Sequence, residues 1–549
     1  MRHFKSVILA AILCCPSVTF AQGLAGPYLA ASSANYDGSF ADAAEYYARA
    51  MQADPTNKFI EQNALVSFVA AGEFAQALEI AERVGANQNL YVDMVLMANH
   101  ATFGEFTSAR NSFPADSRQV SALLAGLLDA WISVGTGDAE TALAGFDAMD
   151  QNDTVALYGQ YHKSLALAYL DDFAGAAEIL NGDDGPLHLD LGSIEAHVQI
   201  LSELGQKEAA LALLSNVSKG DPLKALRDRL EADEEITFTH IGTPAQGMAQ
   251  ALATMAAALS RDEPNRLALF YARLAQHLDP NYVEAMITAA DILEGEEQYD
   301  LASAAFAMVP NDAPQYKSAA IGQAEVQRRG GDVDGATQTL IELADTYPSD
   351  VNVLNALGDI YRGVENFADA DIAYSRAIDN LQNPPQAYWV LFYTRGISNE
   401  RLGEWDEAEA DFRRALELSP NEPAVLNYLG YSFIEMEINM EEAQQMIETA
   451  SANAPENGAI TDSLAWVLYR LGKFEEAVPH MERAARQMPV DPVINDHLGD
   501  VLWMVGRKVE ARFQWRRALS FDPAEIDETR IRRKLDVGLD LVLEEESDI

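Results

Sequence analysis

The chain has 549 residues, of which 48% are hydrophobic and 22% charged, a composition typical of folded protein. Its 38 basic and 85 acidic residues give a formal net charge of −47. Such a charge repels phosphates and argues against nucleic acid or anionic lipid as the main partner. The two cysteines are Cys14 and Cys15, which excludes a disulfide framework and a cysteine-based zinc site from the rest of the chain.

The first 21 residues have the pattern of a secretory signal peptide. Two basic residues precede an unbroken apolar run over residues 7–15, which is too short to span a bilayer. A small-x-small triplet then leads to predicted cleavage before Gln22 and export to a bacterial periplasm. An uncleaved anchor is the alternative. Lipidation is disfavoured, because Leu13 precedes Cys14 and Cys14 precedes Cys15, whereas a lipidated cysteine normally follows a small residue. No later segment is apolar over the length of a membrane span.

An internal repeat of 34 residues dominates the remainder of the chain. Small residues that follow a short turn recur at this interval, namely Ala43 and Ala77; Ala142 and Ala176; Ala268, Ala302, Ala336 and Ala370; and Ala443, Ala477 and Ala511. This period is typical of a pair of antiparallel helices. Prolines stop several of the second helices, at Pro348, Pro420, Pro455, Pro489 and Pro523.

Residues 351–384 illustrate one such unit. Gly358 and Ala370 are predicted where the two helices cross, since a larger side chain there would push them apart. Leu357 and Tyr374 are predicted to fill the space between the helices. In these positions the chain resembles the tetratricopeptide-repeat superfamily, and the resemblance covers nearly all of the mature chain.

The resemblance implies an all-α protein, an α-solenoid of about fourteen tetratricopeptide helix pairs in two superhelical arms. An N-terminal degenerate array is expected over 22–214 and a C-terminal array over 249–523. Residues 215–248 are interpreted as the break between the arms, because Ile236 to Ile241 alternate like a strand. A merely degenerate repeat is the alternative. Residues 524–549 are predicted to form a capping helix and an acidic tail.

The C-terminal array resembles a narrower group, the repeat proteins exported by proteobacteria. The similarity lies in "VLNYLGYSFIEM" and "DSLAWVLYRLGKFEEAV". Some members of that group are adaptors that hold carboxyl-terminal-processing proteases and cell-wall hydrolases together in the envelope. The resemblance therefore implies a protein-binding scaffold, possible clients being envelope proteases or hydrolases.

Motifs that would indicate catalysis or cofactor binding are missing from the sequence. There is no phosphate-binding G-x-x-x-x-G-K-[ST], no G-x-S-x-G nucleophile turn and no H-E-x-x-H. The nine histidines are scattered without ligand spacing. We therefore expect no enzyme activity, no catalytic residue, no cofactor and no metal.

The first helix of each pair lines the concave face of such a solenoid, and its outward positions are the candidate binding residues. In the C-terminal array these are Asn355, Arg362, Asn427, Tyr431, Asp462, Trp466, Tyr469, Asp496, Asp500 and Trp503. An acidic, aromatic groove should prefer a basic or aromatic extended segment of a protein partner. A glycan is the alternative ligand, because aromatic rings also stack on sugars. For the tryptophans, packing between repeats is the competing interpretation. Basic residues from Arg512 to Lys534 are either capping charges or a docking patch.

Overall fold

The computed structural model describes residues 23–113, 120–149, 153–182, 187, 189–215, 223–261 and 265–547. These residues form 31 α-helices and one 3-10 helix, with no β-strand among them, which confirms the predicted all-α class. The predicted signal peptide, residues 1–21, and its cleavage site before Gln22 lie outside the described residues. Compactness divides the chain into two units: unit 1 ends at Thr339, and unit 2 begins at Leu340.

Unit 1 consists of α1 (Ala25–Tyr36), α2 (Phe40–Ala53), α3 (Lys58–Ala71), α4 (Phe74–Val84), α5 (Leu90–Thr102), α6 (Phe106–Ser112), α7 (Ala122–Gly135), α8 (Ala139–Asp147), α9 (Asp153–Tyr169), α10 (Phe173–Asn181), α11 (Leu191–Glu203), α12 (Lys207–Leu213), α13 (Lys224–Glu231), α14 (Pro244–Leu259), α15 (Arg266–Leu278), α16 (Val283–Gly295), α17 (Tyr299–Phe306), α18 (Tyr316–Arg329) and the first part of α19 (Val333–Thr346).

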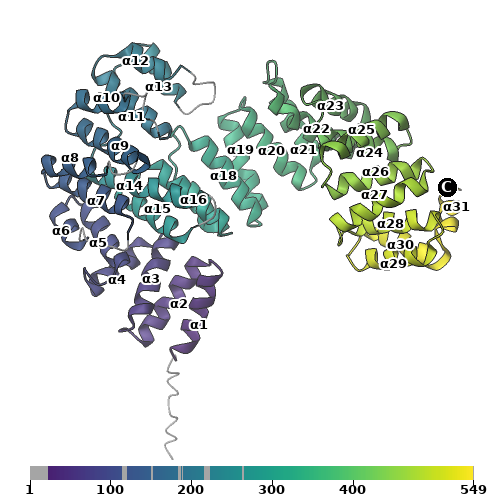
Figure 1. The fold of residues 1–549 in the computed structure, drawn as a ribbon, viewed down its shortest axis with the longest axis horizontal. Coiled ribbons are helices and arrows are strands. Elements are labelled where there is room, and N and C mark those ends of the chain that lie inside the picture. The colour runs from purple at the N-terminus through teal and green to yellow at the C-terminus, as the bar shows by residue number, and fades with distance from the viewer. Residues whose placement is uncertain are drawn as a thin grey trace, which may run out of the picture. The chain divides into compact units, whose positions relative to one another are not determined.

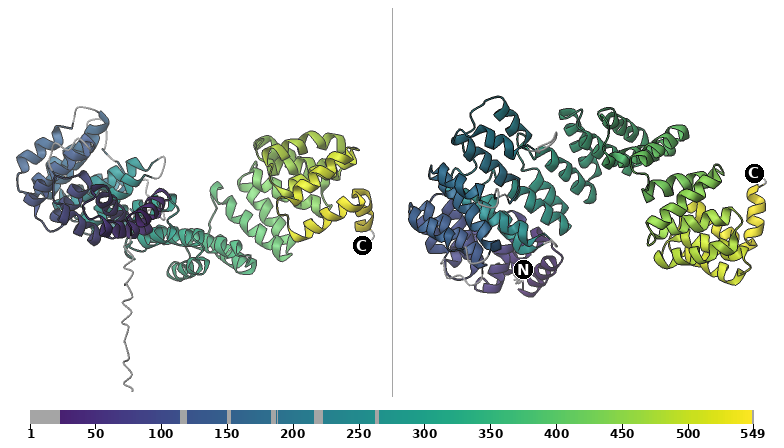
Figure 2. Two further views of the ribbon diagram at one scale, coloured as in Figure 1. Left: turned by 90° about the horizontal axis from the view of Figure 1, so that it is seen from below. Right: turned by 45° about the horizontal axis from the view of Figure 1, so that its top comes forward.

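Unit 2 continues with α20 (Val351–Gly363), α21 (Phe367–Asp379), η1 (Gln386–Tyr388), α22 (Trp389–Leu402), α23 (Trp405–Leu418), α24 (Pro423–Glu435), α25 (Met440–Asn453), α26 (Gly458–Arg470), α27 (Phe474–Gln487), α28 (Pro492–Met504), α29 (Lys508–Leu519), α30 (Glu525–Val537) and α31 (Leu539–Ser547). Consecutive helices from α20 onward pack against one another, and Figures 1 and 2 show this succession in green and yellow.

The alanines that define the 34-residue period are the innermost side chains of both units. Each of them, from Ala43 to Ala511, is 0% exposed. Gly358 of α20 explains why small residues are needed: a β-carbon there would lie 2.5 Å from the Tyr374 ring of α21. The two helices approach so closely that ring and backbone touch, as the sequence predicted.

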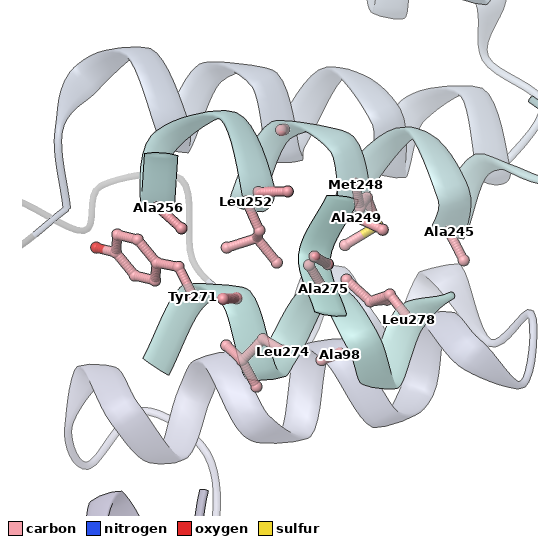
Figure 3. Packing of buried hydrophobic residues seen from close by; sticks show 14 of the residues in the cluster. Ala98, Ala245, Met248, Ala249, Leu252, Ala256, Tyr271, Leu274, Ala275 and Leu278 are labelled. Carbon is pink, nitrogen blue, oxygen red and sulfur yellow. The ribbon is translucent and has the colours of Figure 1, made fainter. Parts of the chain in front are cut away.

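In unit 1, α14 and α15 pack against the first helices of the N-terminal array. α14 contacts α5, α7 and α9, while α15 contacts α3 and α5. Figure 3 shows alanine and leucine side chains of α14 and α15, among them Ala249 and Leu274, packed together and beside Ala98 of α5. Gly247 lets α14 approach α7, since a β-carbon there would lie 2.2 Å from the Trp131 ring. The chain thus fills the inner face of its own first repeats.

The predicted break at residues 215–248 is therefore not where the chain divides. Ile236 and Ile241 are buried in the core of unit 1, and α14, which begins at Pro244, belongs to the same unit. The division falls instead between residues 339 and 340, within α19. The reason lies in the tertiary structure. Where the repeat period is lost, the chain turns onto the face of its first repeats. There, apolar packing on that face replaces the stacking of one repeat on the next.

Two helices, rather than one, end unit 2. Gly538, with φ of 90°, separates α30 from α31. Ile531 and Leu539 are buried against the preceding repeat, which is the expected behaviour of a cap. Ile526, in the first turn of α30, is 79% exposed and takes no part in this cap.

Candidate protein-binding groove

The first helices of the pairs in unit 2, here called helix A, line two adjoining cavities of about 430 and 470 Å3. Three residues, Tyr431, Glu435 and Val493, border both cavities, so together they form one continuous feature that we call the central groove. The first cavity lies among α22, α24, α26 and the start of α28. The second extends from α24 to α30.

The helical period explains which side chains reach the groove. Residues four apart lie on one face of a helix, so Asn427, Tyr431 and Glu435 form one stripe on α24. Asp462, Trp466 and Arg470 form the matching stripe on α26. The start of α26 is fixed by Asn457, whose side chain accepts the Ile460 N–H at 3.2 Å, and Asp491 caps α28 in the same way.

Trp466 anchors the wall between the two cavities. Its ring stacks at 4.6 Å on Tyr469 and at 3.9 Å on His497, and its Nε1 donates to Glu435 at 3.1 Å. Only 7% of the residue is exposed, at the second cavity. Trp466 therefore contributes both to the repeat core and to the groove wall.

The His497 imidazole is held by charge as well as by stacking. Its Nδ1 lies 3.0 Å from Asp462 Oδ2, and both side chains are nearly buried. Burial favours neutral imidazole, but the facing carboxylates, Asp462 first, raise the pKa of His497 above its usual value. Asp462, which was predicted to bind a partner, is therefore already engaged by His497 within the chain.

Two tyrosine hydroxyls at the first cavity are hydrogen-bonded to carboxylates of the chain. Burial, and then Glu435 and Asp462, raise the pKa of Tyr431 well above its usual range. Burial raises the pKa of Tyr428 to about 12, and its hydroxyl donates to Glu400 at 3.2 Å. Both groups are protonated at neutral pH and donate their O–H to Glu400 and Glu435, so toward a ligand the hydroxyl oxygens can act only as acceptors.

Asn427 provides an acceptor. Asn427 borders the first cavity, and its buried Oδ1 has no hydrogen-bond partner within the described part of the chain. A buried amide oxygen without a partner is costly, and an N–H of a bound chain would satisfy it. Glu400, Glu435 and Asp491 border the same cavity, against a single arginine, Arg401. The first cavity is therefore acidic, aromatic and able to accept a backbone N–H.

The last repeat of the predicted groove is closed. Lys534 of α30 is 0% exposed and places its Nζ 2.7 Å from both Asp496 Oδ2 and Asp500 Oδ2. Arg530 adds a second cation, 3.4 Å from Asp500. Burial and the Asp500 charge raise the pKa of Asp496 to about 6, with Lys534 opposing the shift. Asp500 was predicted to line the groove, but it is an internal ion-pair partner of the cap.

Two aromatic predictions are corrected in the same region. Trp503 is 7% exposed and packs at 5.2 Å against Trp515, and it borders neither cavity. Tyr469 is buried behind Trp466 and also borders neither. Both fill the space between repeats, because the twelfth position of helix A turns toward the next pair once that pair is stacked on it. The packing interpretation holds for these two residues.

Asn355 and Arg362 lie on α20, away from the central groove. Asn355 donates to Asp359 at 3.0 Å, and Arg362 contacts Asp359 and the Tyr374 hydroxyl. They form a local polar network within one repeat. Of the predicted set, Asn427, Tyr431, Asp462, Trp466 and Asp496 border the central groove.

The basic residues near the C-terminus are mostly neutralised within the chain. Arg532 pairs with Glu528 and Arg533 with Glu545. Arg512 donates to the Leu535 carbonyl, and Arg517 to that of Pro489. The Arg512 contact joins α29 to the cap, and the other three use basic side chains within the chain, which favours the capping interpretation over a docking patch.

Sequence reasoning missed several groove residues, chiefly Tyr428, Glu435, Arg470, Val493 and His497. Continuing the four-residue stripe by one turn from Tyr431 and Trp466 would have found Glu435 and Arg470. His497 and Val493 enter from the next repeat, so no spacing within one helix identifies them. Across the described ranges, no group of three or more His, Asp or Glu side chains could hold a metal ion. Over the same ranges, every helix is too short or too polar to span a bilayer.

The fold and groove define the class: a helical-repeat solenoid with an open inner face in its second unit. Residues 379–522 match the family model described as Tetratricopeptide repeat. This match confirms the tetratricopeptide-repeat resemblance, and residues 379–522 consist of tetratricopeptide repeats. Proteins of this class are generally protein-binding scaffolds, and the fold is typically non-catalytic.

Two curated proteins are similar over part of the chain. The TPR repeat-containing protein PA4667 of Pseudomonas aeruginosa is 30% identical over 180 residues, which cover 32% of this chain and 30% of that protein. Protein O-mannosyl-transferase Tmtc2 of Drosophila melanogaster is 33% identical over 87 residues, 16% of this chain and 9% of that protein. The chain thus spans less than a third of either relative.

Two solved structures are similar to the chain at low identity. The Cut9–Hcn1 hetero-tetramer of the APC/C covers 93% of this chain and 96% of the solved chain, with a TM-score of 0.39 and 13% identity. A tetratricopeptide repeat protein from Parabacteroides merdae covers 47% and 98%, with a TM-score of 0.38 and 16% identity.

Proposed function

We propose that this chain is an exported, non-catalytic scaffold of the bacterial periplasm that binds an extended segment of a protein partner in the central groove. The observation that carries the proposal is the first cavity, which is lined by carboxylates, protonated tyrosines and Asn427, whose Oδ1 has no hydrogen-bond partner among the described residues. Such a wall suits a chain whose backbone donates N–H groups and whose side chains are basic or aromatic. The N-terminal pattern of residues 1–21 supports export.

Envelope proteases and cell-wall hydrolases are the proposed client class. The support is the resemblance of the C-terminal repeats to exported adaptors of proteobacteria. A scaffold needs no reactive group of its own, in keeping with a groove in which the one histidine, His497, is occupied by Asp462.

A glycan ligand fits the groove less well. Stacking on sugar requires a free aromatic face, whereas Trp466 lies against two parallel rings and is 7% exposed. Trp503 is internal. Of the two tryptophans considered from sequence, neither offers such a face.

The test is binding of a peptide array to the mature chain, residues 22–549, with soluble cell-wall fragments as the comparison ligand. We expect retention of peptides that carry Lys, Arg or aromatic residues in alternation. Asn427→Ala and Glu435→Gln should weaken that binding, whereas Glu441→Gln, an exposed change on α25, should leave it unaltered. Equal loss in all three variants, or retention of wall fragments alone, would contradict the proposal.

A further inference from the structure

A non-helical segment of unit 1, residues 236–241, lies on α9 and α11, which are the first helices of their pairs and so correspond to helix A of unit 2; we call it the inserted segment. Its burial alternates: Ile236 is buried, Thr237 and Thr239 are exposed, and Phe238 between them is half-buried. This period of two is that of an extended chain with one face bound.

Side chains of α11 hold the inserted segment by its backbone. Gln199 Oε1 accepts the N–H groups of Thr239 and His240, at 2.9 and 3.1 Å. Glu203 Oε1 accepts the N–H of Phe238 at 2.8 Å. Because these bonds involve backbone N–H groups, they do not depend on the side chains of the bound chain. Gln199 is itself 4% exposed, so the acceptor is built into the structure.

Two side chains of the inserted segment occupy subsites. The Phe238 ring packs edge-on against Phe173 at the start of α10, with centroids 6.1 Å apart. His240 Nε2 lies 2.7 Å from Gln250 Nε2 and 3.4 Å from the Tyr161 hydroxyl. The arrangement is that of a peptide with an aromatic anchor and, two residues later, a polar one.

The second subsite is not fully satisfied by histidine. Gln250 is 5% exposed, and its Oε1 has no hydrogen-bond partner among the residues described. Burial lowers the pKa of His240 to about 4, although Asp190 opposes the shift, so the ring is neutral. Burial raises the pKa of the nearby Glu195 and of Glu284. A buried acceptor and carboxylates around a neutral group favour a cation at this position.

We infer that the helix-A face of α9 and α11 is a second peptide-binding site, occupied within the chain by the inserted segment. Its preferred external ligand is an extended segment with an aromatic residue and, two positions later, Lys or Arg in place of His240. Such a ligand replaces the inserted segment and pairs its cation with Gln250 Oε1 and the surrounding carboxylates. The inference does not depend on the central groove, which lies in unit 2.

The experiment measures binding of labelled peptides to the full mature chain by fluorescence anisotropy. One peptide has the sequence of residues 234–242, and the second has His240→Lys. We expect the Lys peptide to bind at least tenfold more tightly than the native one. Phe238→Ala in the protein should loosen the inserted segment and raise the affinity for both peptides at least tenfold. Thr237→Ala, an exposed change in the same segment, should not.

Three outcomes would overturn the inference. One is a Phe238→Ala chain with a lowered melting temperature and no gain in peptide binding, since the segment would then be structural only. Another is equal affinity for the two peptides. A third comes from a variant that keeps Phe238: His240→Lys in the protein should raise the melting temperature and weaken peptide binding, so a lowered melting temperature contradicts it. Glu435→Gln should change none of these results, which separates this site from the central groove.

Discussion

Unit 1 and unit 2 are built from the same helix pair and use its inner face in opposite ways. In unit 1, α14, α15 and the inserted segment cover the helix-A face of the first repeats. In unit 2, helix A from α22 to α28 borders the central groove, and only the last repeat is covered, by α30. The comparison shows that a tetratricopeptide repeat determines the shape of its inner face but not whether that face is accessible to a partner. Whether that surface binds a partner is decided by what the rest of the chain does.

The two coverings also differ in chemistry. α14 presents alanines and Gly247 to the repeats, so the inner face of unit 1 is closed by close apolar packing. α30 presents Lys534 and Arg530, so the last repeat of unit 2 is closed by charge. Apolar packing is insensitive to salt, and removal of one apolar side chain leaves a cavity. Removal of one buried charge instead leaves its oppositely charged partners uncompensated.

The largest expected effect is on the charged covering. Lys534→Met should destabilise unit 2 by roughly 3–5 kcal/mol, because Asp496 and Asp500 would remain buried without their cation. Hydrogen exchange read by mass spectrometry would show the loss in α28 to α30 and no change in α1 to α18. Adding Asp500→Asn to Lys534→Met should restore part of the stability. Equal loss in both variants would show that the ion pair is not what closes this repeat.

The apolar covering should respond to overpacking. Gly247→Ala should destabilise unit 1 by roughly 1–3 kcal/mol, since the added β-carbon would lie 2.2 Å from the Trp131 ring. Gly26→Ala, on α1 with no atom within 4 Å of the new carbon, is the matched control and should be neutral or stabilising. Thermal unfolding followed by hydrogen exchange in α7 and α14 measures the difference. An unaffected Gly247→Ala protein would mean that α14 is only loosely held.

Acidification should change the stability of the two units in opposite directions. Burial lowers the pKa of His162, which is 0% exposed, to about 3, so its folded-state pKa lies below the unfolded value of 6.5. The stability it contributes is complete above pH 6.5 and is lost as the pH falls; at pH 5.5 the loss is about 1.4 kcal/mol. His277, with a pKa of about 4, acts in the same direction. Asp291, whose pKa burial raises to about 6, offsets part of the loss.

His497 in unit 2 has the opposite sign. Its pKa is raised in the folded state, so its contribution is present below pH 6.5 and is lost as the pH rises through the folded-state value. Between pH 7.5 and 5.5 the melting temperature of unit 1 should fall relative to that of unit 2, as resolved by calorimetry or by hydrogen exchange. His162→Asn should flatten the dependence in unit 1. A parallel fall of both units in the unaltered protein would contradict the assignment.

The smallest expected effect concerns the open face. Asn427→Ala should weaken partner-peptide binding by about 0.5–1.5 kcal/mol, one hydrogen bond to a bound backbone, without lowering the stability of unit 2. Isothermal titration and thermal unfolding of the same variant separate the two quantities. If the variant were more stable but bound the peptide equally well, the Asn427 oxygen would only destabilise the fold. That outcome would contradict its role as an acceptor for a bound backbone.

The candidate site could be predicted in part. Outward positions on one helix follow from the 3.6-residue period, which placed Asn427 and Tyr431 correctly at the groove. Asp500 and Trp503 obey the same period, but α30 and Trp515 cover them. Their burial depends on residues more than one turn away in sequence, which no helical spacing contains. His497 was passed over because a lone histidine gives no signal until Asp462 and Trp466 of the preceding repeat surround it.

The sequence by itself determined the helix pair, its 34-residue period and the residues at its crossing, because these depend on neighbours within one or two turns and on small side chains such as Gly358. Only the tertiary structure decided where the chain divides and which inner face stays open. Residues 215–248 lack the 34-residue period. A sequence without that period looks the same whether the segment forms a hinge or leads back into the core. The segment leads back into the core because α14 packs against α7, which lies far from it in the chain. The apolar area that this packing buries exists only once the repeats are assembled.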